Sequence, residues 1–124
     1  MSKTEKYPLY VVNEEKKAVS CKIKSQGEFF VGVARCHEDD TFDVQKGKDI
    51  AFNRCRVLIN KRILQSELET YDIVKEIIHH YEEQGLGKVR SKAWDNFLLE
   101  AKNRVDHRKM IIRQIEMKLN DLLE

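Results

Sequence analysis

The first part of the chain alternates short apolar runs with polar turns. Residues 9–12 form an apolar run, and a charged turn separates them from residues 19–24. In this second run apolar and polar side chains alternate strictly, which is typical of a strand with one buried and one solvent-facing side. Residues 29–34 form a third run, rich in aromatic and β-branched side chains. The pattern predicts a three-stranded antiparallel β-meander over residues 7–36, with the lysines of the second run on its wet face.

A helical pattern follows the meander. Asp43 is a favourable N-cap, and apolar residues then recur at helical spacing. Because no glycine or proline interrupts residues 48–84, the segment 43–84 is either one very long helix or two helices that break near Ser66. Gly85 is well placed to end the segment as a helix C-cap.

The last segment, residues 91–124, carries a heptad repeat. Its apolar seam advances in alternating steps of four and three through Trp94, Leu98, Ala101, Val105, Arg108, Ile112, Ile115, Leu119 and Leu122. Ser91 is the expected N-cap of this helix. A helix of some thirty residues spans roughly 45 Å, more than a small sheet covers, so part of it packs on the preceding helix or on another copy. We therefore expect an α+β fold, one domain over residues 1–124, and a homo-oligomer, dimeric or higher.

Composition limits the class of protein. The 124 residues are 41% hydrophobic and 35% charged, which is too apolar for a disordered chain and too charged for a membrane protein. The 23 basic and 21 acidic residues nearly balance, so nothing favours nucleic-acid binding. Three widely spaced cysteines predict no disulfide framework. With no secretory signal at the N-terminus, we expect a cytoplasmic protein.

The usual signatures of catalysis and of metal binding do not occur. Cys36 and His37 are adjacent, whereas zinc ligands come in spaced pairs and a catalytic Cys–His pair meets in space. A calcium loop beginning at Asp39 lacks its glycine and its final glutamate. Neither GxSxG, a Walker loop nor GxGxxG is found, and Gly85 and Gly87 are better explained as a turn between helices than as a phosphate-binding loop. We expect a protein that is not an enzyme and needs no metal or cofactor.

Basic residues gather on the last helix, where Arg104, Arg108, Lys109 and Arg113 accompany His107. Arg108 falls on the apolar seam itself, where an unanswered charge is unfavourable. Either Arg108 reaches solvent or pairs with a glutamate of a neighbouring helix, or the seam opens there into an anion site. Lys109 and Arg113 are four residues apart and share one helix face.

Aromatic and amide side chains lie just upstream of these cations. Trp94 and Phe97 are candidates for stacking on a purine, Asn96 for reading a base edge or a ribose, and Arg90 for meeting a phosphate. Core packing is the competing interpretation of Trp94. On the third strand, Phe29 and Phe30 are expected to be core aromatics and Arg35 a surface charge. The ligand-binding candidates are Arg90, Trp94, Asn96, Phe97, Arg104, Arg108, Lys109 and Arg113.

The layout resembles the phage proteins that defeat Thoeris bacterial immunity by acting as sponges for its nucleotide signal. The similarity rests on the meander that ends in residues 33–43, on the helix that opens at residues 47–55, and on the long terminal helix. It implies a non-catalytic protein that binds a cyclic ADP-ribose isomer in pockets between protomers of an oligomer. It also implies that some members take up cyclic oligonucleotides at a separate basic site. Carried onto this chain, Lys109 and Arg113 become candidates for facing a phosphate.

Two other functions remain open. The heptad helix is also suited to docking on a host protein, as a small interaction module or inhibitor, with its arginines steering association. A small nucleic-acid-binding regulator is disfavoured by the near-neutral charge.

Overall fold

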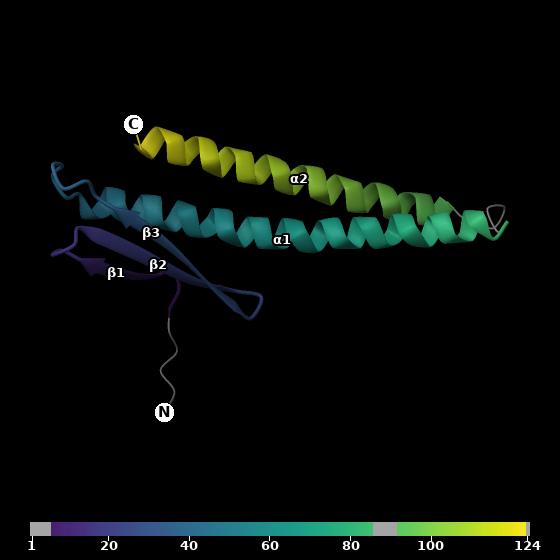
Figure 1. The fold of residues 1–124 in the computed structure, drawn as a ribbon, viewed down its shortest axis with the longest axis horizontal. Coiled ribbons are helices and arrows are strands. Elements are labelled where there is room, and N and C mark those ends of the chain that lie inside the picture. Colours follow the sequence, from purple (N-terminus) through teal and green to yellow (C-terminus); the bar gives the residue numbers. More distant parts are fainter. Residues whose placement is uncertain (1–5, 86–91, 124) are drawn as a thin grey trace, which may run out of the picture. The chain divides into compact units, whose positions relative to one another are not determined.

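The computed structural model describes residues 6–85 and 92–123, and it confirms the α+β class. The elements are β1 (Leu9–Asn13), β2 (Ala18–Ser25), β3 (Glu28–Arg35), α1 (Val44–Glu83) and α2 (Lys92–Leu123) (Figure 1). The strands form one antiparallel sheet in the order β1-β2-β3. The predicted meander is therefore confirmed, and its last turn is tight because Gln26 and Gly27 both adopt positive φ, as two-residue hairpin turns require.

One face of the sheet is buried by α1. Val19 and Cys21 of β2 are fully buried, and their cross-strand partners on β3, Ala34 and Gly32, are buried as well. The alternation in residues 19–24 produces this arrangement, because side chains two residues apart point to the same side of a strand.

Gly32 allows β3 to lie directly on the backbone of α1. A Cβ at this position would meet the carbonyl oxygen of Ala51 and would lie 2.6 Å from the amide nitrogen of Cys55. Two polar contacts support the close approach. The Arg54 guanidinium donates to the Val33 carbonyl at 2.7 Å, and the Cys55 thiol donates to the Phe30 carbonyl at 3.2 Å.

Helix α1 is continuous, which decides between the two arrangements that the sequence left open. No break occurs at Ser66, and the helix runs for 40 residues. Asp43 caps its first turn, accepting a hydrogen bond from the Lys46 amide at 3.1 Å, as predicted. Gly85 follows the last turn with a φ of 71°, which confirms the predicted C-cap. The predicted cap Ser91 lies outside the described residues.

The described chain forms two compact units. One comprises the residues up to Asn60 together with those from Ile112 onward, and the other is Lys61–Ile111. The first unit buries the inner face of the sheet against the start of α1, and it includes Ile112, Ile115 and Leu119 in its core. The described part of the second unit consists of the later part of α1, the turn at residues 84–85 and the earlier part of α2, and its buried apolar residues are Val74, Ile78, Ala101 and Val105.

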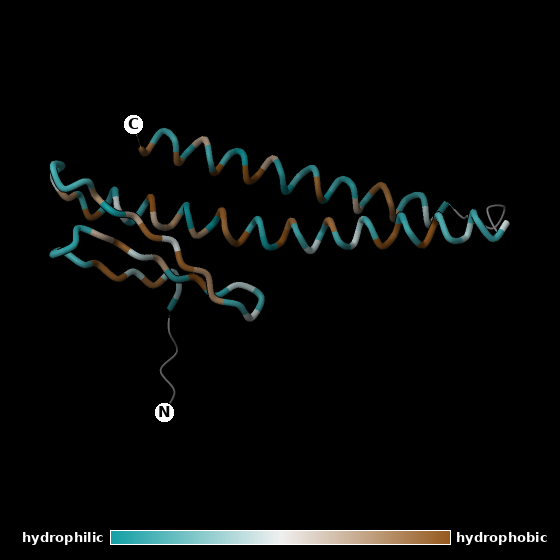
Figure 2. Tube along the Cα trace, viewed as in Figure 1, coloured by the Kyte–Doolittle hydropathy of each residue, from teal (hydrophilic) through white to brown (hydrophobic). Residues whose placement is uncertain are grey.

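The heptad seam of α2 is confirmed as a buried stripe. Five of its nine positions are buried, namely Ala101, Val105, Ile112, Ile115 and Leu119, and Figure 2 shows hydrophobic positions recurring along both helices. Trp94 is half-buried and makes an edge-on contact with Tyr81, with ring centroids 6.1 Å apart. This is the packing role that competed with a ligand platform.

The outer face of the sheet differs from its prediction. Lys22 and Lys24 do lie on this side, but Phe29 is 53% exposed beside them, so its assignment as a core aromatic is wrong. Phe29 lies opposite Lys24 across the β2–β3 pair, on the side away from α1. Phe30, one residue later, points the other way and is half-buried.

Candidate functional site

The basic residues of α2 are exposed, apart from Arg108. Arg104, Lys109 and Arg113 are exposed, and within the described residues none of them forms an ion pair. Asn96 and Phe97 are exposed on the same helix. The remaining candidate, Arg90, lies outside the described residues.

These candidates do not converge on one place. Arg104 and Lys109 are five residues apart, which turns them about 140° from each other around the helix. Phe97 shares the flank of Arg104, because the two are seven residues apart, whereas Arg113 shares the flank of Lys109. A single copy of α2 therefore presents two separate basic flanks, and only an assembly of chains would bring both to one ligand.

Arg108 pairs with a glutamate of the neighbouring helix, which was one of the interpretations drawn from the sequence. Its Nε donates to Glu67 Oε1 of α1 at 2.8 Å, and the two side chains are only 23% and 17% exposed. The positive charge of Arg108 on the seam is thus neutralised by Glu67 within the second unit. The ion pair accounts for Arg108 without a ligand.

A concave site lies elsewhere, in the first unit. A hollow of about 470 Å³ opens where β3 leads into α1, a volume in the range of small-molecule sites. Its lining includes the basic residues Arg35, His37 and Lys46 and the acidic residues Asp40 and Asp43. The apolar part of its lining is Ala34, Phe42, Ile50, Leu122 and Leu123.

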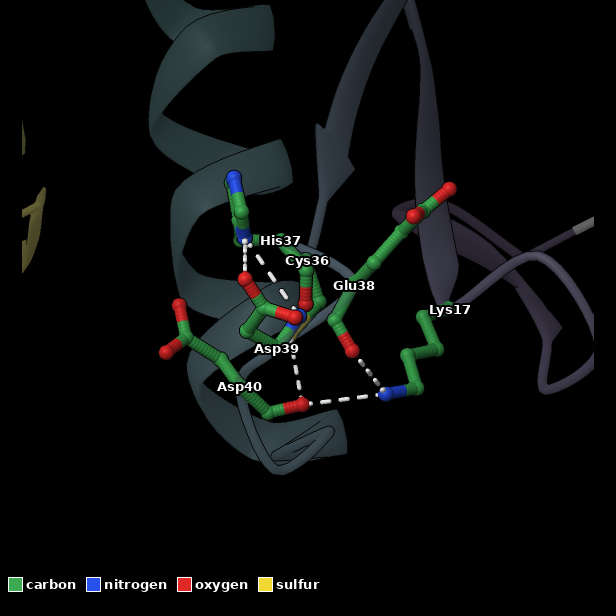
Figure 3. A network of polar contacts seen from close by, with 6 residues as sticks. All are labelled: Lys17, Cys36, His37, Glu38, Asp39 and Asp40. Atoms are coloured by element: carbon green, nitrogen blue, oxygen red, sulfur yellow. Dashed lines mark hydrogen bonds and ion pairs between the residues drawn. The ribbon is translucent and has the colours of Figure 1, made fainter.

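The wall formed by residues 36–41 is held by a lysine from another turn. Lys17 donates from Nζ to the carbonyls of Glu38 and Asp40 at 3.1 and 3.0 Å (Figure 3). Its own carbonyl accepts from the Cys36 amide at 2.8 Å. Lys17 thereby ties the β1–β2 turn to the β3–α1 connection. His37 closes the loop locally, since its Nδ1 lies 3.4 Å from the Asp39 amide.

The first turn of α1 also lines the hollow. This turn packs closely on β2 because residue 47 is glycine, where a Cβ would lie 2.8 Å from Cγ2 of Val19. The N-terminus of a helix carries a partial positive charge that favours anions. In the part of the chain that the structure describes, the side chains of Arg35 and Lys46 form no ion pair. Both cations remain available to a ligand in the hollow.

The buried thiols are unsuited to nucleophilic chemistry. Cys21 and Cys55 are fully buried, and burial raises the pKa of Cys21 to about 11 and also raises the pKa of Cys55. A thiol acts as a nucleophile through its thiolate, which Cys21 does not form near neutral pH. Cys36 is only half-buried, and its Sγ lies 3.4 to 3.7 Å from the carbonyl oxygens of residues 37, 40 and 41.

Among the described residues, no group of three or more His, Cys, Asp and Glu side chains is arranged to hold a metal ion. The same part of the chain contains no helix that combines the length and the apolar character needed to cross a membrane.

The hollow was not predicted from the sequence. Its polar residues come from the end of a strand, an irregular connection and a first helical turn, so no fixed spacing relates Arg35 to Lys46. The only available signal was the position of Asp43, which marked a helix start directly after a polar connector.

Comparisons with known proteins give no relative. No protein-family model matches the sequence, and neither a curated protein nor a solved structure matches it.

Proposed function

We propose that this protein binds and sequesters a cyclic nucleotide signal, a cyclic ADP-ribose isomer, without cleaving it, and that it acts as a phage anti-defence protein in the host cytoplasm. The proposal rests on the resemblance to anti-Thoeris sponges and on the lining of the hollow. The observation that carries it is a concave site of about 470 Å³ with two cations that have no partner within the described residues.

The chemistry of the lining suits a nucleotide. Arginine and lysine bind phosphate, and Arg35 and Lys46 lie beside the positively charged start of α1. Phe42 and Ile50 offer apolar surface to a purine. Asp40 contributes a carboxylate, a hydrogen-bond acceptor for ribose hydroxyls. A mixed lining of this kind fits a ligand with phosphate, ribose and base better than it fits a simple polyanion.

Sequestration sets a demanding affinity. A signal molecule is scarce, so a sponge needs a Kd near 1 nM, or about −12 kcal/mol. Pockets formed in advance reduce the ordering cost of binding, and Lys17 holds the wall of this one through two carbonyls. Self-association belongs to the same proposal, because it would bring the separate basic flanks of α2 together around a ligand.

Calorimetry with purified protein and cyclic ADP-ribose isomers tests the proposal directly. Replacing both Arg35 and Lys46 by alanine is expected to weaken binding at least about tenfold, the effect of losing charged hydrogen bonds. Lys61→Ala, at an exposed position of α1, is the matched control. Recovery of intact ligand after heat denaturation, identified by mass spectrometry, separates sequestration from hydrolysis.

A second variant locates the site. If the triple replacement of Arg104, Lys109 and Arg113 by alanine abolishes binding while the Arg35/Lys46 variant retains it, the ligand is held by α2 in an assembly instead of by the hollow. Absence of binding for every isomer would refute the proposed function.

The second candidate is docking on a host protein through α2. It is favoured by exposed apolar side chains on the helix, of which Leu99, Met110 and Met117 lie opposite the buried seam and are 57%, 49% and 61% exposed. Methionine and leucine on one exposed helix face are suited to the groove of a partner protein. A pulldown that returns one dominant host protein, from material that purifies without nucleotide, would favour this function.

A further inference from the structure

The last turn of α2 reaches the hollow of the first unit. Leu122 and Leu123, the last two residues of this helix, line the hollow together with residues of β3, of the β3–α1 connection and of α1. Ile112, Ile115 and Leu119 are buried earlier in the same part of α2 and belong to the core of the same unit. The hollow is therefore completed by a segment that lies far from the β3–α1 connection in the sequence.

The two segments contribute different chemistry to the lining. Every charged side chain among the described lining residues belongs to residues 35–46, including Arg35 and Lys46, and α2 adds two leucines to them. Leu122 is half-buried and Leu123 is 53% exposed, so both retain apolar surface that a ligand can cover. A ligand that fills the hollow thus meets charged groups on one segment and aliphatic groups on the other.

The helix ends at the hollow set the orientation of such a ligand. Helix α1 begins there, and the start of a helix carries a partial positive charge. Helix α2 ends there, and the last carbonyl groups of a helix carry a partial negative charge. A phosphate is therefore favoured beside Arg35 and Lys46 and disfavoured beside Leu122 and Leu123. The group left for the leucines is uncharged and apolar, such as the base of a nucleotide.

We propose that the last turn of α2 determines the specificity of the hollow and selects nucleotides over phosphates that lack a base. The inference rests on the proposed function, because it concerns the same hollow, and it adds which segment recognises the base. A ligand that contacts both segments also links them. It gains its full affinity only while Leu122 and Leu123 are docked, so its binding opposes fraying of the helix end.

The test uses two probes that differ in the base at C1′, adenosine 5′-monophosphate (AMP) and ribose 5-phosphate. Each is titrated into the full-length protein labelled with ¹⁵N, and the amide signals of residues 35–46 and 119–123 are followed. We expect AMP to bind at least about tenfold more tightly, since its base covers apolar surface. AMP should shift both groups of signals and slow amide hydrogen exchange in residues 119–123, whereas ribose 5-phosphate should shift residues 35–46 alone.

The variant Leu122→Ala/Leu123→Ala isolates the contribution of α2. It should fold, because the buried residues from Ile112 to Leu119 still anchor the helix. Its preference for AMP should fall to about threefold or less, while its affinity for ribose 5-phosphate stays unchanged. Leu122→Met/Leu123→Met, which conserves apolar volume, should keep the full preference. Leu99→Ala, at a leucine of similar exposure in the second unit, is the matched control and should keep it as well.

The outcomes separate this inference from the proposed function. Absence of AMP binding, equal affinity for the two probes, or a preference that the alanine variant retains in full would each overturn the inference. In all three cases the proposed function stands if a cyclic ADP-ribose isomer binds. The predicted preference without binding of any isomer would support base recognition by α2 and refute the proposed function. If neither probe nor any isomer binds, both are refuted.

Discussion

Arg108 and Glu67 form an ion pair between the two helices of the second unit, with Nε and Oε1 2.8 Å apart. Each side chain is less than one quarter exposed, and the pair lies in line with Val105 on the apolar seam. Arg108 thus interrupts the apolar seam of α2 with a positive charge, and Glu67 of α1 neutralises that charge. A pair of this kind favours one register of the helices, because sliding by one turn would leave both charges unpaired.

Breaking this ion pair should destabilise the protein. Glu67→Gln leaves the half-buried guanidinium with a neutral partner, and we expect a loss of about 1.5–3 kcal/mol in the free energy of unfolding. Urea denaturation of Glu67→Leu, of Arg108→Leu and of Glu67→Leu/Arg108→Leu completes a double-mutant cycle. The double variant should recover most of the loss, since apolar residues of similar size often replace a buried ion pair without cost. Equal destabilisation in all three variants would contradict this account.

Gly32→Ala should be far more harmful than Gly47→Ala. The Cβ at residue 32 would meet backbone atoms of Ala51 and Cys55, which cannot move without shifting α1. We expect a loss of about 1–3 kcal/mol or more from overpacking. At residue 47 the nearest atom is Cγ2 of the buried Val19 at 2.8 Å, so a side chain and not backbone has to shift, and the higher helix propensity of alanine, about 0.5–1 kcal/mol, offsets part of that cost. Thermal unfolding followed by circular dichroism measures both, and similar Tm values for the two variants would be inconsistent with the close approach of β3 to α1.

Lys17→Met should loosen the wall of the hollow while keeping the length of the side chain. The substitution removes the donors to the carbonyls of residues 38 and 40, each hydrogen bond contributing about 1 kcal/mol. Amide hydrogen exchange should quicken across residues 36–41, and ligand affinity in the hollow should fall. Lys16→Met is the matched control, because only its backbone amide is engaged, with Asn13 Oδ1. Unchanged exchange in the Lys17 variant would mean that residues 36–41 are held by their own contacts and not by Lys17.

Stability should decline at alkaline pH because of the buried thiol of Cys21. Its pKa is about 11 in the folded chain, against about 8.5 when unfolded. Between these values the unfolded chain binds fewer protons, so the free energy of unfolding falls as pH rises, by up to about 1.4 kcal/mol per pH unit for one group. The pKa values of Tyr10 and Cys55 are raised by burial as well and act in the same direction. Tm measured from pH 8 to 11 should fall less steeply in Cys21→Ala than in the natural sequence.

The elements that the sequence predicted well are those with a strong local signal. Alternation in residues 19–24 depends only on the geometry of a strand, and the heptad steps of α2 depend only on the geometry of a helix. Asp43 and Gly85 act through their own backbone and nearest turn, so their cap roles follow from residue type. Each of these predictions concerns contacts between residues a few positions apart.

Predictions failed or stayed open where the environment comes from distant residues. Phe29 is as apolar as any core residue, but α1 covers only the inner side of the sheet, which leaves Phe29 in solvent. The sequence around Ser66 contains no strong stop signal, and its apolar spacing is compatible with one helix or with two, so only the structure shows that α1 is continuous. The sequence did not predict the hollow, because residues from a strand end and from a helix start form it together.

By itself the sequence determined the meander, the helical character of the two segments that follow it and the stripe that α2 buries, since periodicity and caps are encoded in neighbouring residues. Only the tertiary structure decided that Arg108 finds Glu67, that Arg35 and Lys46 share a hollow, and that Phe29 stays exposed on the outer sheet face. Those outcomes depend on contacts between residues that are far apart in the sequence. The local pattern of apolar and polar residues does not encode such contacts.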